Sequence, residues 1–144
     1  MPNYAYSKQM ILYLRRLYQK SIEENKEVTS GDLAVEAGVR TSSAIDIIKR
    51  LEEHGFVDRT LWGPIYLTKK GIIEARKLVY KHRIIETYLC RCLSIKDDVA
   101  CEEAAFLETQ TSERVVYAMC EKLGHPSICI HGRKIPHVHK VKSK

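Results

Sequence analysis

Residues 28–55 hold the pattern that most constrains the fold of this chain, two short helical segments joined by a turn of a few residues. Thr29 or Ser30 can cap the first segment, and Gly38 suits the left-handed position that follows a helix end. Thr41 can cap the second segment, which turns one apolar face inward. That face consists of Ala44, Ile45, Ile48 and Leu51. The pattern predicts a helix-turn-helix.

The hydrophobic period changes directly behind the second helix. Residues 56–61 and 64–68 form two predicted short strands around Trp62-Gly63. A hairpin in this place is typical of the wing of a winged helix. Residues 6–25 precede these elements with apolar side chains at steps of three and four, which predicts a leading amphipathic helix.

A long amphipathic segment opens the second half of the chain. It predicts one helix from Lys69 to about Leu93, longer than the winged helix beside it requires. Further helices are expected within residues 94–109 and 111–124. Because three helices bury little core by themselves, we expect this half to dimerise.

The expected fold is mainly α with a small β-hairpin wing, a winged helix-turn-helix followed by a helical dimerisation module. Residues 1–72 form the winged-helix DNA-binding domain in this division, and residues 73–144 form the dimerisation domain. The second domain ends in a tail that is basic and lacks acidic residues after His131. A solvated terminus is the first interpretation of this tail, and contact with phosphates is the alternative.

Composition narrows the classes of function. The net charge of +6 is compatible with nucleic acid without being specific for it. No apolar run is long enough to span a membrane, so no membrane partner is expected. Five cysteines at irregular spacing indicate a reducing, cytoplasmic setting. A Gly-rich phosphate loop, a nucleophile elbow and an HExxH sequence are all absent, so an enzyme is not expected.

Exposed positions at the start of the second helix of the motif are expected to face DNA, because a winged helix places this helix in the major groove. These positions are Arg40, Thr41, Ser42, Ser43 and Asp46. The candidates for phosphate contacts are Lys49, Arg50 and, on the wing, Arg59. The alternative is that Thr41 and Ser42 cap the helix while Asp46 pairs with a neighbouring basic residue. Both roles stay open for Thr41, and DNA contact is favoured for Ser43.

His82 and Glu86 lie four residues apart in the long helix and therefore share one face. Together they can bind one divalent ion, although such a pair alone is more often a simple contact on a helix surface. Towards the C-terminus, His125, Cys129 and His131 offer further ligands without an obvious fourth. Three other cysteines are expected to fill the core as small apolar side chains. They are Cys90, Cys92 and Cys120.

Several groups of residues, in a fixed order, carry a resemblance to a known family. They are Tyr13–Tyr18, Lys81–Glu86, Glu102–Glu108, Leu123–Pro126, Cys129–Gly132 and Ile135-Pro136. With them the chain resembles the metal-dependent repressors of the diphtheria-toxin-repressor family over essentially its whole length. It stops where longer members add an SH3-like domain, so it is similar to a short, two-module form.

The resemblance implies a homodimer that represses from a palindromic operator when a divalent transition metal orders the leading helix. The resemblance implies Fe or Mn as the metal. It also implies that residues 73–144 form the metal-sensing domain as well as the dimerisation domain. His82 and Glu86 match the His and Glu of the family's ancillary site, whose third ligand, usually His, falls on Cys101. A thiolate there favours Zn, Co or Ni, and Fe(II) stays open.

The primary, regulatory site of the family is poorly matched. Its positions fall on Leu12, Arg15, Ala105, Glu108 and Thr109. Only Glu108 keeps a strong metal ligand. Three interpretations therefore stay open: metal sensing at the remaining ligands, a redox switch at Cys101 or Cys129, and constitutive DNA binding with a degenerate metal site.

Overall fold

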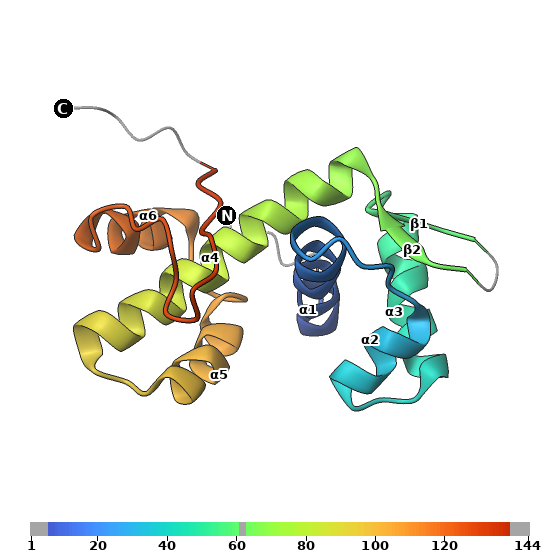
Figure 1. The fold of residues 1–144 in the computed structure, drawn as a ribbon, viewed down its shortest axis with the longest axis horizontal. Coiled ribbons are helices and arrows are strands. Elements are labelled where there is room, and N and C mark those ends of the chain that lie inside the picture. The colour runs from blue at the N-terminus through green and yellow to red at the C-terminus, as the bar shows by residue number, and fades with distance from the viewer. Residues whose placement is uncertain (1–5, 61–62, 139–144) are drawn as a thin grey trace. The chain divides into compact units, whose positions relative to one another are not determined.

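A computed structural model describes residues 6–60 and 63–138 of the chain (Figure 1). Two compact units divide between Arg76 and Lys77, inside one long helix, whereas the sequence-based division was drawn at residue 72. Leu61 and Trp62 of the expected wing, and the basic tail beyond Val138, lie outside the described residues.

The first unit, Tyr6–Arg76, contains the helix-turn-helix and the hairpin. Its elements are α1 (Lys8–Leu17), η1 (Tyr18–Glu23), α2 (Ser30–Ala37), α3 (Thr41–Glu53), β1 (Val57–Arg59), β2 (Ile65–Leu67) and the start of α4 (Lys69–Leu93). In this unit α3 packs against α1, α2 and β1. The largest side chains that fill its interior include Tyr13, Leu14, Leu17, Leu33, Ile48, Leu51, Phe56 and Ile65.

The leading helix is shorter than predicted in its α-helical part. The α-helical geometry ends at Leu17, and the wider turn η1 follows it to Glu23. The Ser21 hydroxyl donates to the carbonyl of Leu17 at 2.5 Å, a local bond that competes with the regular helical ladder. Asn25, with φ of 53°, then turns the chain away.

The predicted helix-capping residues are confirmed for α2 but not for α3. Thr29 caps α2 in a reciprocal box with Asp32, at 2.9 and 3.2 Å, and Gly38 takes the left-handed conformation after the helix. The prediction that Thr41 caps α3 is wrong. Arg40 holds the extended cap position, so Thr41 is already helical and its hydroxyl cannot reach the amides of the first turn.

The hairpin pairs β1 and β2 antiparallel, with Val57 opposite Leu67. Behind it, Thr68 starts α4 by accepting from the Gly71 amide at 3.0 Å and donating to the Gly55 carbonyl at 2.6 Å. This brings α4 so close to the loop that a Cβ on Gly71 would lie 1.9 Å from the Phe56 carbonyl oxygen. Only glycine fits at this crossing.

The second unit, here residues 77–138, surrounds the rest of α4 with α5 (Asp97–Leu107), α6 (Glu113–Lys122) and the C-terminal segment (Figure 1). Its core consists mainly of Tyr80, Ile84, Ile85, Leu89, Ala100, Ala104, Val116, Cys120, Cys129 and Ile135. Among the cysteines expected to fill the core, Cys120 is buried, Cys90 is half-buried and Cys92 is exposed. The prediction is wrong for Cys92, because residues two apart on a helix face different ways.

Residues 127–135 form a tight reversal, called here the C-terminal turn. Cys129 donates its amide to the Arg133 carbonyl at 2.8 Å, and Gly132 has a left-handed φ of 75°. The Arg83 guanidinium of α4 donates to the Lys134 carbonyl at 2.5 Å, which ties the turn to the helix. None of the helices in the described part of the chain is both long and apolar enough to cross a membrane.

Candidate metal centre

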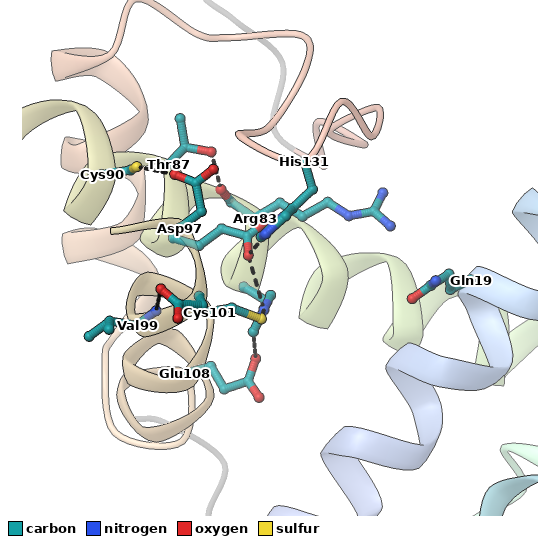
Figure 2. A network of polar contacts seen from close by, with 12 residues as sticks. Gln19, Arg83, Thr87, Cys90, Asp97, Val99, Cys101, Glu108 and His131 are labelled. Carbon is teal, nitrogen blue, oxygen red and sulfur yellow. Dashed lines mark hydrogen bonds and ion pairs between the residues drawn. The ribbon is translucent and has the colours of Figure 1, made fainter. Parts of the chain in front are cut away.

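A buried row of polar side chains is centred on His82 of α4. Its Nδ1 donates to Glu108 Oε2 at 2.8 Å, and its Nε2 lies 3.4 Å from Glu86 Oε2 and 3.7 Å from Cys101 Sγ. His82, Glu86 and Glu108 are only 5%, 3% and 3% exposed. Figure 2 shows Cys101 and Glu108 reaching this row from the neighbouring helix.

Helical spacing explains why these side chains meet. His82 and Glu86 are one turn apart on α4, and Cys101 and Glu108 are two turns apart at α5 and its C-terminal cap. Ala100 and Ala104, one turn apart on α5, are fully buried in the core of this unit. Their small side chains let α5 approach α4 closely.

The contact with Glu108 decides which nitrogen of His82 is available. Because the carboxylate accepts the Nδ1 proton, the neutral ring has its lone pair on Nε2, on the side of Glu86 and Cys101. Burial alone would raise the pKa of Glu86, but the hydrogen bond from His82 and the positive charge of His82 in its protonated form, with smaller contributions from His131 and Cys129, lower this pKa. His82 Nε2 and Glu86 Oε2 are then two hydrogen-bond acceptors only 3.4 Å apart. A proton or a cation between them would make this contact favourable.

The donor set fits a divalent transition metal. The ligand atoms of His82, Glu86 and Cys101 all lie within 4.8 Å of one another. An imidazole nitrogen, a carboxylate oxygen and a sulfur suit Zn, Co, Ni or Fe. Glu108, counted among the ligands in the sequence analysis, lies instead on the opposite nitrogen of His82, where it orients the ring.

A second group adjoins the first and was not predicted from the sequence. Glu86, Cys129 and His131 also have ligand atoms within 4.8 Å of one another, and His131 Nδ1 lies 3.4 Å from Glu86 Oε2. Burial raises the pKa of the Cys129 thiol. Backbone hydrogen bonds from His131 and Arg133 act in the opposite direction and offset part of this rise. In Figure 2, His131 approaches from the C-terminal segment.

His125, the third ligand considered at the C-terminal end, does not join this group. Its Nδ1 lies 3.3 Å from the buried Cys120 Sγ, which His137 approaches at 3.9 Å from another side. His137 also donates from Nε2 to the Pro126 carbonyl at 2.8 Å. Both histidines therefore hold the end of α6 against the C-terminal segment.

The candidate DNA-contacting residues lie at the surface of the first unit. Arg40, Thr41, Ser42, Ser43, Asp46 and Lys49 are exposed. No hydrogen bond or ion pair within residues 6–60 and 63–138 engages the side chain of Thr41, Ser42 or Asp46, so the capping and pairing alternatives are not observed. Arg59 is half-buried, and its Nε lies 3.6 Å from Glu52 Oε1.

Comparisons by sequence point to one family of regulators. Residues 68–137 match the family model of the metal-binding and dimerisation domain of the iron-dependent repressors. The uncharacterized HTH-type transcriptional regulator MJ0568 of Methanocaldococcus jannaschii is 33% identical over 104 residues, covering 72% of this chain and 83% of that protein. The transcriptional regulator MntR of Escherichia coli is 26% identical over 114 residues, covering 79% and 73%.

Solved structures agree with this assignment and confirm the predicted fold class. The manganese regulator SloR matches with a TM-score of 0.81 and 31% identity, over 89% of this chain and 59% of that one. A manganese-dependent transcriptional repressor in complex with manganese matches with a TM-score of 0.81 and 33% identity, over 90% and 59%. The chain thus spans about three fifths of the length of these solved regulators. It belongs to the diphtheria-toxin-repressor family, the iron-dependent repressors, which are metal-dependent transcription regulators and not enzymes.

Proposed function

We propose that this protein is a metal-responsive transcription repressor that binds a palindromic DNA operator as a homodimer. The observation that carries the proposal is the buried group of His82, Glu86 and Cys101, in which Glu108 orients the imidazole. The same chain holds a helix-turn-helix with an exposed second helix. A metal-binding group and a DNA-reading element in one chain are the two parts that such a regulator needs.

Support for DNA binding comes from the first turn of α3. Its hydroxyl side chains point to solvent and are not used in capping, so they are available to phosphates or base edges. In a winged helix this second helix enters the major groove and the wing reaches the backbone. We assign base contacts to Ser43 and its neighbours and a phosphate contact to Arg59.

Support for a homodimer comes from apolar side chains that the second unit leaves exposed. They include Leu93, Val99, Phe106 and Leu107, with Phe106 64% exposed. Interfaces between subunits bury apolar side chains that a single copy leaves exposed. A symmetric dimer has two copies of α3, one for each half of a palindrome.

His82, Glu86 and Cys101 are the residues that would hold the metal. A bound divalent cation would neutralise the charges of Glu86 and Cys101 and join α4 to α5 at this point. Relatives are named for manganese, but a sulfur ligand favours zinc, cobalt or nickel in this chain. Binding energy at this site can favour one dimer geometry over another, which is how a metal regulates DNA affinity.

Metal analysis paired with DNA binding tests the proposal. The purified protein is expected to contain a divalent transition metal and to select a palindromic duplex from random DNA. Chelation at constant salt should weaken binding to that duplex by about 5- to 150-fold, the usual range of coupling between two sites. Undiminished affinity in metal-free protein would exclude the metal response, and release by thiol oxidation alone would favour a redox switch.

Replacing Arg59 with alanine is expected to weaken binding to all DNA sequences alike and to reduce the salt slope by about 1, because one phosphate contact is lost. Ser43→Ala should instead change the sequence preference. Salt titrations of both variants on matched and mismatched duplexes measure the two effects. Glu52→Gln is the control, since it removes the ion partner of Arg59 and leaves the guanidinium in place. An unchanged slope in Arg59→Ala would refute the phosphate contact.

A further inference from the structure

The C-terminal turn brings two potential metal ligands to Glu86. Cys129 is 4% exposed and lies in the core of the second unit, while His131 is exposed and its Nδ1 lies 3.4 Å from Glu86 Oε2. The Cys129 thiol also contacts the Glu86 carboxylate. Buried sulfur, imidazole nitrogen and carboxylate oxygen therefore converge within 4.8 Å.

The backbone of this turn is built to hold that arrangement. The amide of Cys129 donates to the Arg133 carbonyl at 2.8 Å, and Gly132 donates to the Cys129 carbonyl at 3.0 Å. Arg83, one turn before Glu86 on α4, fixes the far side of the turn through the Lys134 carbonyl. The position of Cys129 and His131 beside Glu86 is thus set by bonds that do not involve their own side chains.

We infer that Glu86, Cys129 and His131 form a second metal position, adjoining the first, for a thiophilic divalent ion such as Zn²⁺. The inference rests on the proposed metal centre, because the two positions share the Glu86 carboxylate. A carboxylate that bridges two ions is a familiar arrangement in two-metal sites.

Charge and geometry favour two positions over one enlarged site. Each group of three is compact by itself, and Glu86 is their common member, with His82 Nε2 and His131 Nδ1 each 3.4 Å from the same carboxylate oxygen. Glu86, Glu108 and the thiolates of Cys101 and Cys129 together supply four negative charges, which balance two divalent ions. Each thiol releases its proton to solvent when the metal binds.

Zinc stoichiometry and cobalt spectra of the full, reduced chain test the inference. The wild-type protein is expected to bind two equivalents of Zn²⁺. Cys129→Ser and His131→Ala should each bind one equivalent, and Cys101→Ser should bind one at the other position. In the Co²⁺ forms, Cys129→Ser and Cys101→Ser should each lose about half of the sulfur-to-cobalt charge-transfer absorption. Cys92→Ser, at an exposed cysteine of α4, is the matched control and should keep two equivalents.

A single equivalent in the wild-type protein, or two in both Cys129→Ser and His131→Ala, would overturn the second position. His131 is at the surface, so its replacement keeps the test valid if Cys129→Ser does not fold. Failure of the proposed function looks different. If Cys129→Ser loses one equivalent while operator binding never depends on metal, the second position stands and the regulatory proposal falls.

Discussion

Replacing Gly71 with alanine is expected to destabilise the unit Tyr6–Arg76 by about 3 kcal/mol, at the upper end of the cost of overpacking. The added Cβ would lie 1.9 Å from the Phe56 carbonyl oxygen and 2.8 Å from its carbonyl carbon. Both atoms belong to the backbone, so no side chain can rotate to relieve the contact. Helix propensity alone predicts the opposite sign, a gain of about 1 kcal/mol for alanine over glycine.

Urea unfolding, followed by circular dichroism of the helices, measures the effect. Gly31→Ala is the matched control, because Gly31 also lies in a helix but its Cβ would meet only Thr29 Oγ1 at an ordinary 3.7 Å. That variant should be neutral or more stable by up to about 1 kcal/mol. Equal midpoints for Gly71→Ala and wild type would show that α4 can move away from the loop at little cost.

Replacing Glu86 with glutamine is expected to have the largest effect on metal binding. Loss of a residue that only orients a ligand typically lowers metal affinity by about 10- to 100-fold, so loss of a ligand should exceed about 100-fold. Because Glu86 belongs to both groups of three, both should weaken. The amide preserves the shape of the side chain and can still hydrogen-bond His82 and His131, so the fold should be retained.

Zinc titration in competition with a chelator measures this loss, and operator binding with and without zinc measures its consequence. The variant should bind DNA equally in both conditions. Glu103→Gln is the control, since Glu103 is exposed on α5 and belongs to neither group. Zinc affinity within tenfold of wild type in Glu86→Gln would mean that the carboxylate is not a ligand.

Much of the fold could be predicted because local patterns and tertiary packing agree. The long helix begins and ends at the predicted residues, Lys69 and Leu93, since its apolar positions keep one period and Ser94, with φ of 58°, breaks it. The wide turn η1 was missed because helical periodicity does not distinguish a π-helical turn from an α-helical one. The cap of α3 was misplaced by one residue because Thr41 has a favourable side chain but the wrong backbone conformation.

The candidate site was only partly accessible from the sequence. His82 and Glu86 were paired because a four-residue spacing fixes a common helix face, and Cys101 joined them through the family resemblance. Cys129 and His131 were noticed as potential ligands, but their meeting with Glu86 depends on the turn at Gly132 and its tie to α4. The role of Glu108 depends on which nitrogen of His82 it contacts. This contact cannot be predicted from the spacing of residues in the sequence.

The C-terminal turn also sets the order in which the two groups come into existence during synthesis. The ribosome makes the chain from its N-terminus, so His82, Glu86 and Cys101 are all present on α4 and α5 before Cys129 has been added. At that stage every residue of the first group has been made, and the second lacks two of its three residues. The first group therefore needs only α4 and α5 in order to form, whereas the second also needs the C-terminal turn to close onto α4.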